Sequence, residues 1–113
     1  MSYATSRLQC IMRGGDINWW LLDTVDTIAT VNTAGFISDA SQPAAGAKGM
    51  LKGDRVTVRI WTTTIPAATS ELRSAADAAN ILTAMHECWV IGISAAGAAD
   101  LTDGLAVTAT NTD

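Results

Sequence analysis

The run from Arg55 to Thr64, RVTVRIWTTT, constrains the fold most, because it alternates regularly between two kinds of side chain. Valine or isoleucine stands at every second position, and polar or amphipathic side chains stand between them. Successive side chains of a strand point to opposite faces of a sheet, so this period of two predicts a half-buried strand. Its apolar face is Val56, Val58 and Ile60, and its other face is Arg55, Thr57, Arg59 and Trp61.

A second strand is predicted over residues 16–24, DINWWLLDT, where four large apolar residues lie between two aspartates. Four consecutive large apolar side chains cannot all face one core, since neighbours in a strand point in opposite directions. Either both faces of this strand are covered, or one of Trp19 and Trp20 lies at a subunit interface, where tryptophan is enriched.

The segment between these strands, DTIATVNTAGFISDA over residues 26–40, fits a helix of two turns better than a strand. Asp26 or Thr27 can act as the N-cap, whose side-chain oxygen accepts from a free N–H of the first turn. Gly35 then stands where a left-handed residue ends a helix, and Phe36 follows as the apolar residue that folds back. The apolar side of this helix is Ile28 and Val31.

The second half of the chain predicts one more helix and two more strands. Residues 69–80, TSELRSAADAAN, have high helix propensity, and a strand is expected from about Leu82 through VIGIS. Asp103-Gly104 is a hairpin signal, and the last strand is LAVTATNT.

The chain is predicted to be one compact domain, because 113 residues is the length of a single domain. Residues 1–15 have no clear periodicity and end in Arg-Gly-Gly, so we expect an N-terminal arm there and a single β-rich domain over residues 16–113. The predicted fold class is mostly β, resembling a barrel or a sandwich, with one or two short helices. A core rich in alanine, valine and isoleucine gains less per residue than one of leucine and phenylalanine, which favours association with copies of the chain or with a larger surface.

The composition argues against two classes of partner. The net charge of −4 argues against direct nucleic-acid binding, which depends on Lys and Arg neutralising phosphates. No run has the length of a membrane span or of the apolar part of a secretory signal. We therefore expect a protein that is made and folded in a cytoplasm, without a membrane partner.

The sequence contains no constellation that predicts catalysis, a metal site or a cofactor. His86 and Cys88 would share one face of a strand, and with Cys10 they could form a three-ligand site or a Cys–His nucleophile pair. Short paired ligand spacings are absent, as are a GxSxG elbow and a P-loop ending. The two cysteines are expected to be reduced thiols, although they could also pair with each other.

Two segments carry a resemblance to a known group. DTIATVNTAGFISDA, followed closely by LKGDRVTVRI, resembles small proteins of tailed bacteriophages. In that group a Trp-rich strand leads into ATV-x-x-AGYF, a loop, L-x-x-GD and a β-strand. The ending DLTDGLAVTATNTD is similar to theirs. The resemblance covers roughly residues 17–60 and 97–113, and Phe36 stands where the group commonly has tyrosine.

The resemblance implies a virion structural protein, and among virion roles a capsid decoration, or cement, protein. Such proteins are short, lack enzymatic sites and often form trimers over the three-fold junctions of the shell. The implied partner is the major capsid protein, the implied location is the capsid exterior, and the implied form is a homotrimer. The residues expected at partner interfaces are Arg7, Arg13, Trp19, Trp20, Arg55, Arg59 and Trp61.

Two alternatives remain at this stage. One is a head-fibre, tail or receptor-binding module, in which exposed tryptophans and carboxylates would bind glycans. The other is a small enzyme that uses His86 and Cys88.

Overall fold

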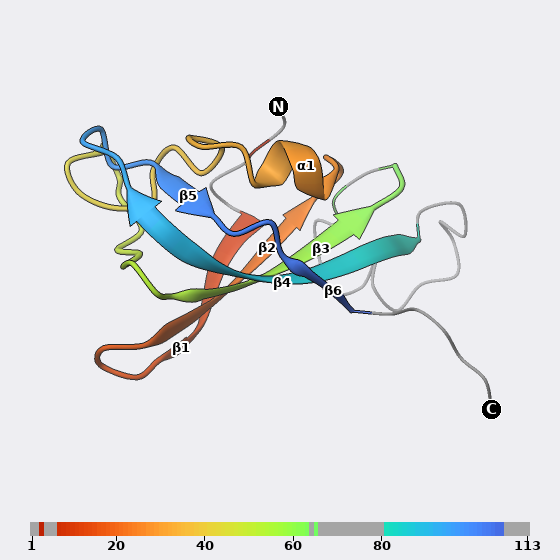
Figure 1. Cartoon of the computed structure of the whole chain (residues 1–113), viewed down its shortest axis with the longest axis horizontal. Coiled ribbons are helices and arrows are strands. Elements are labelled where there is room, and N and C mark those ends of the chain that lie inside the picture. Colours follow the sequence, from red (N-terminus) through yellow and green to blue (C-terminus); the bar gives the residue numbers. More distant parts are fainter. Residues whose placement is uncertain (1–2, 4–6, 64, 66–80, 108–113) are drawn as a thin grey trace.

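The structure, a computed structural model, describes residue 3, residues 7–63, residue 65 and residues 81–107. This part of the chain folds into a curved sheet with one short helix, as Figure 1 shows. The mostly β prediction is confirmed. The elements are β1 (Leu8–Arg13), β2 (Asn18–Thr24), α1 (Ile28–Val31), β3 (Arg55–Trp61), β4 (Leu82–Ile93), β5 (Ala99–Leu101) and β6 (Leu105–Val107).

The sheet is mixed, with the strand order β1-β2-β3-β4-β5 and with β6 paired to β4. β2 and β3 are parallel, whereas the other neighbours are antiparallel. Parallel neighbours require a crossover connection, and here residues 25–54, which include α1, provide it. In Figure 1, α1 and the segment after it lie over one face of the sheet.

The core lies between the crossover and this face of the sheet. The alternation predicted for β3 is confirmed, because Val56 and Val58 are fully buried while Arg55 is exposed. The pairing register continues the same face into β1, β2 and β4. The buried apolar residues are Leu8, Trp20, Leu22, Val31, Phe36, Ile37, Ala40, Met50, Val56, Val58, Ile60, Cys88, Val90, Ala99 and Leu101.

The helix predicted after β2 is present, but it has one turn instead of two. Thr27 is its N-cap, with Oγ1 accepting from Thr30 N at 3.4 Å, and Val31 points into the core. Gly35 has a φ of +89°, as predicted for a left-handed position, although the helix ends earlier, at Val31.

Phe36 holds the crossover against the rest of the molecule. It is buried in the core, and the ring of Tyr3 meets it edge-on, with 5.8 Å between the ring centroids. The Tyr3 hydroxyl also donates a hydrogen bond to the carboxylate of Asp39. Residue 3 therefore contacts the layer that covers the sheet.

Within the predicted N-terminal arm over residues 1–15, residues 8–13 form the edge strand β1. Leu8 is buried in the core, and β1 pairs with β2 along its length. The register shifts between Cys10 and Met12, which marks a β-bulge. A bulge inserts one extra residue and so breaks the period of two, which explains why the sequence shows no strand pattern here.

β5 and β6 lie along the same edge of β4 and pair with different parts of it. The hairpin turn that leads into them lies at residues 94–98, not at Asp103-Gly104 as predicted. Asp103-Gly104 instead separates β5 from β6. Gly104 has a φ of +87° and packs against Cys88, where an added Cβ would lie 2.9 Å from the sulfur. Both constraints require glycine at this position.

The predicted helix over residues 69–80 and the end of the predicted last strand, from residue 108, lie outside the described residues.

The side chain of Asp54, the residue just before β3, is fully buried and accepts hydrogen bonds from three residues. Leu51 N and Trp20 Nε1 donate to Oδ2 at 2.9 Å and 3.0 Å. Asn18 donates through its backbone N and its Nδ2 at 3.2–3.4 Å. A buried carboxylate is costly unless hydrogen bonds satisfy its oxygens. This carboxylate therefore connects the start of β2 to the turn that begins β3.

The backbone of the same turn connects it to β4. Asp54 N donates to Leu51 O at 3.1 Å, and Gly53 has a φ of +89°, as the third position of a type II turn requires. Gly53 N donates to Val90 O at 2.8 Å, and Val90 N donates to Asp54 O at 2.9 Å.

Replacing Asp54 with alanine is expected to destabilise the protein by about 3 kcal/mol, because buried donors on Trp20, Leu51 and Asn18 would lose their acceptor. Chemical denaturation followed by tryptophan fluorescence measures the change. Asp16→Ala is the matched control, since Asp16 is an exposed turn residue, and its effect should stay within about 0.5 kcal/mol. Equal stability of the two variants would contradict the role of Asp54.

Candidate interaction face on the open side of the sheet

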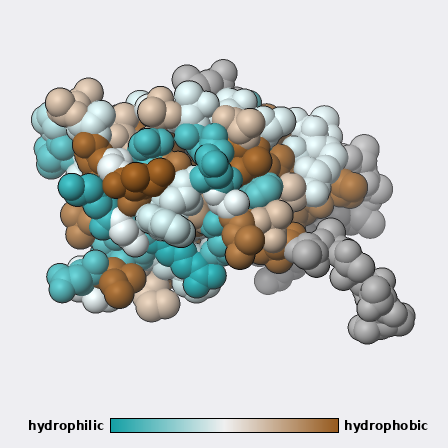
Figure 2. Space-filling model, viewed as in Figure 1, coloured by the Kyte–Doolittle hydropathy of each residue, from teal (hydrophilic) through white to brown (hydrophobic). Residues whose placement is uncertain are grey.

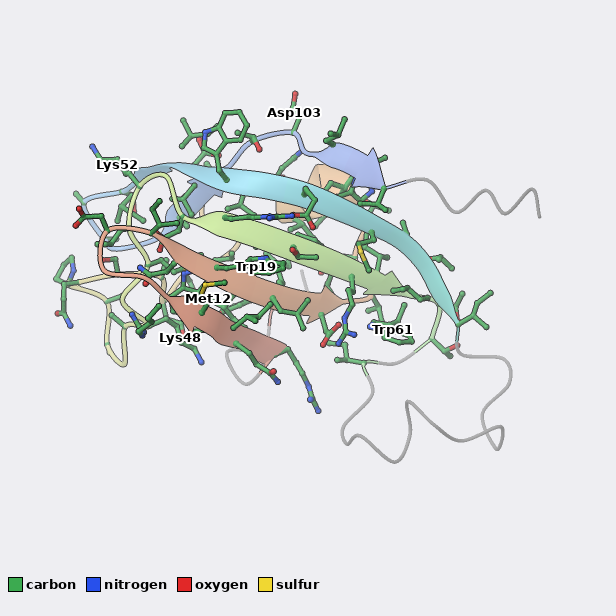
Figure 3. All side chains as sticks on the ribbon, turned by 90° about the horizontal axis from the view of Figure 1, so that it is seen from below. Met12, Trp19, Lys48, Lys52, Trp61 and Asp103 are labelled. Carbon is green, nitrogen blue, oxygen red and sulfur yellow. The ribbon has the colours of Figure 1, made fainter. Side chains whose placement is uncertain are left out.

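The face of the sheet opposite α1 is the candidate functional site, and Figure 3 looks onto it. We call it the open face. Residues paired directly across strands share one face, so the register gives its rows. The rows across β2, β3 and β4 are Trp19–Arg55–Trp89, Leu21–Thr57–Glu87 and Asp23–Arg59–Met85.

A network of hydrogen bonds and one cation–π contact connects the side chains of the first two rows. The Arg55 guanidinium lies 4.5 Å from the ring centroid of Trp19, and its Nε donates to Glu87 Oε2 at 2.6 Å. Trp19 Nε1 donates to Thr57 Oγ1 at 2.8 Å, and Thr57 Oγ1 donates to Glu87 Oε1 at 2.7 Å. Because each residue contacts two others, the network fixes side chains on three strands and neutralises Arg55.

A second network braces the other end of the open face. Arg59 binds Asp23 through two hydrogen bonds, from Nε to Oδ1 at 2.7 Å and from Nη2 to Oδ2 at 2.9 Å. Trp61 Nε1 donates to the same Oδ1 at 3.0 Å, and the Arg59 guanidinium lies 5.6 Å from a Trp61 ring centroid. Bidentate arginine–carboxylate pairs are geometrically specific, and this one is largely buried. The arginine and the aspartate therefore cancel each other's charge.

Four of the seven predicted interface residues thus meet on the open face, namely Trp19, Arg55, Arg59 and Trp61. The other three lie elsewhere. Trp20 is buried in the core and bonded to Asp54. Arg13 lies 5.4 Å from the Trp20 ring and donates to Lys48 O at 3.3 Å, on the side of the crossover. Arg7 directly precedes β1 and is half-buried. A partner contact by any of the seven stays a prediction.

Sequence reasoning missed the most exposed apolar residues of the open face. Trp89 is 59% exposed on β4, and Leu105 is 75% exposed on β6. Ile91 and Val107 are also about half exposed. We call these four residues the apolar strip. In the side view of Figure 2, brown apolar surface lies over β4 and β6 among hydrophilic residues. The signal that could have identified Trp89 and Ile91 is their alternation with Cys88 and Val90, which are buried.

A depression of about 550 Å³ adjoins the apolar strip on the open face. Its lining includes the exposed ring of Trp89, the Leu105 side chain and the paired Arg55 and Glu87. Clefts that bind ligands or side chains typically have volumes of about 300–1,000 Å³. The open face is therefore hollowed beside its largest exposed side chain.

The two cysteines lie too far apart to share one site. Cys10, Trp20, Val56 and Cys88 lie in one row across four strands, so the Cα atoms of the two cysteines are about 14 Å apart at about 4.8 Å per strand. A disulfide requires Cα atoms within about 7 Å, and both thiols are free. Burial raises the pKa of Cys88 from 9.0 to about 11, which opposes thiolate formation. In the same strand, Nδ1 of His86 is buried without a hydrogen-bond partner.

Among the residues that the structure describes, no group of three or more His, Cys, Asp or Glu side chains is placed to hold a metal ion. Over the same residues, no helix has the length and apolar character needed to cross a membrane. Comparison with family models, with curated proteins and with solved structures finds no match. A functional assignment therefore depends on the open face and on the sequence resemblance.

Alkylation should distinguish the two cysteines. At pH 8.5 iodoacetamide is expected to modify half-buried Cys10 in the folded protein, and to modify Cys88 only after denaturation, because Cys88 is buried with a raised pKa. Mass spectrometry of the peptides measures both sites. Rapid alkylation of Cys88 in the folded protein would contradict this prediction and support the Cys–His alternative.

The same thiol predicts a pH dependence of stability. The pKa of Cys88 in the folded protein lies above its ordinary value. The stability that the neutral thiol contributes is therefore fully present below pH 9.0 and is lost as the pH rises through about 11. Denaturation midpoints of wild type and Cys88→Ala, compared from pH 7 to 11, measure this loss. The difference between the two proteins should shrink above pH 9, and a constant difference would contradict the expectation.

Proposed function

We propose that this chain is a structural protein of a tailed-bacteriophage virion, and specifically a capsid decoration protein on the exterior of the head. Its partner would be the major capsid protein, and it would act as a homo-oligomer, with a trimer expected from the resemblance. The observation that carries the proposal is the open face, a braced sheet surface with exposed apolar residues and internally paired charges. Such a surface suits a permanent contact between proteins, because it is rigid before binding and loses little entropy on association.

The residues that carry the sequence resemblance support the proposal through their structural roles. Thr27 caps α1, Gly35 has a left-handed backbone, and Phe36 is buried in the core. In the LKGD segment, Gly53 forms the turn and Asp54 is the buried acceptor before β3. These residues hold the crossover on the sheet, so the resemblance concerns features that specify a fold.

The proposed mechanism is mechanical. Each copy would bridge neighbouring capsid subunits, so that the shell resists the pressure of the packaged DNA. Repeated contacts convert modest affinity per subunit into strong retention, since further contacts form at a high effective concentration. Because Arg55 and Arg59 are already paired with Glu87 and Asp23, the contact would depend on shape and apolar burial more than on opposite charges.

A glycan-binding head-fibre or tail module is a second candidate, and the depression beside Trp89 is the observation that favours it. An exposed indole next to a carboxylate and a guanidinium can stack on a sugar ring while the charged groups bind its hydroxyls. Titration of the purified protein with host polysaccharide would shift its tryptophan fluorescence in that case. The copy number also separates the two functions, because shell decoration requires a number that follows the capsid lattice.

Phage particles that lack the protein are expected to release DNA at a lower temperature than wild-type particles, since the clamps between capsid subunits would be missing. Fluorescence of a DNA-binding dye during heating measures the release. Adding the purified protein back should restore the wild-type release temperature, and denatured protein is the control for the addition.

Two results would contradict the decoration function. One is a release temperature that does not depend on the protein. The other is a copy number in purified virions that matches the symmetry of the portal, tail or fibres.

A further inference from the structure

The apolar strip is the part of the open face on β4 and β6 that the charged networks leave uncovered. Trp89 belongs to the row of Trp19 and Arg55, and Leu105 pairs with Glu87, so both side chains project from the open face. Val107 likewise pairs with Met85 on this face. Ile91 stands two positions after Trp89 on β4 and is half exposed, whereas Val90 between them is buried. These four side chains form an apolar band along β4 and β6.

The charge of this surface favours an uncharged partner surface. The acidic and basic groups of the three rows are Asp23, Arg55, Arg59 and Glu87, and they form two salt bridges at 2.7 Å and 2.6 Å. The three rows therefore have no net charge, although the whole chain has a net charge of −4. A basic or acidic partner would gain little electrostatic energy here. A partner face that is also neutral and apolar could be buried against it without leaving an unpaired charge in the interface.

The shape of the open face favours a second copy of the same chain. Trp89 projects from the sheet and also forms one wall of the 550 Å³ depression, together with Leu105 and Gly53. In a two-fold contact the same surface patch of both copies takes part, so residue i of one copy meets residue j of the other, and the reverse. A projecting side chain beside a hollow therefore allows each copy to place its projection in the hollow of the other. The indole of one copy can thus enter the hollow of the other.

We propose that two copies of this chain associate through the apolar strip, with Trp89 of each copy inserted in the depression of the other. The strip exposes on the order of 400 Å² of side-chain surface, if a whole tryptophan accounts for up to about 250 Å². A stable interface buries about 800 Å² per partner, so the strip supplies the centre and the adjoining rows of Trp19 and Leu21 supply the rim.

The inference concerns the purified protein alone and does not depend on a role in a virion. Sedimentation velocity over a concentration series is the direct test, with wild type, Trp89→Glu, Leu105→Glu and Ile17→Glu. Ile17 is the matched control, because it is an apolar side chain that is 68% exposed in the turn between β1 and β2, two strands away from β4. Far-UV circular dichroism and the denaturation midpoint establish that each variant is folded.

Wild type and Ile17→Glu should associate equally, and both strip variants should associate at least about tenfold more weakly while remaining folded. The two strip variants test the contact independently, since Trp89 and Leu105 are on different strands. A wild-type protein that stays monomeric at all concentrations would overturn the proposal. So would an oligomer that the strip variants leave intact, because another surface would then hold it.

A pair formed through the strip in solution would have to separate before the same face could contact a shell, and a trimer on the shell would use another surface. Failure of this test would leave the decoration function standing, since a monomer can also bind a shell. Failure of the particle experiments would likewise leave the association between copies unaffected.

Discussion

The buried carboxylate of Asp54 is the interaction on which the rest of the structure depends. It accepts hydrogen bonds from the first residue of β2, from the indole of Trp20 and from the turn before β3. These bonds connect the start of β2 to the start of β3, which pair in parallel. Once Trp20 points toward Asp54, Trp19 must point the other way, and Arg55 with it. The composition of the open face therefore follows from one buried acid on the opposite face.

Local patterns in the sequence predict the elements well. The alternation of Val56, Val58 and Ile60 identifies β3, and the capping residue Thr27 identifies α1. The left-handed Gly35 was also predicted, because only glycine adopts that backbone without strain. Each of these signals depends on residues within a few positions of one another.

Long-range features could not be read in the same way. The bulge after Cys10 hides the pattern of β1, and the hairpin signal of Asp103-Gly104 marks an interruption between two strands. The donors to Asp54 lie up to 36 positions away, so the sequence identifies a turn but not a buried acceptor. Likewise, the pairing of Arg59 with Asp23 depends on the parallel register.

The open face contains rows of side chains that bond to one another and a strip of exposed apolar side chains. The rows that begin with Trp19 and Asp23 are bound internally and act as a rigid support. The apolar strip lies beside these rows on β4 and β6, and its side chains are exposed.

Hydroxyl-radical footprinting of the purified protein, at high concentration and after dilution, tests most directly whether the open face is covered by another copy. Trp89 should be protected at high concentration and become reactive on dilution, while Ile17 should react equally in both samples. Equal oxidation of Trp89 at both concentrations, in a protein that does associate, would contradict a contact through this face.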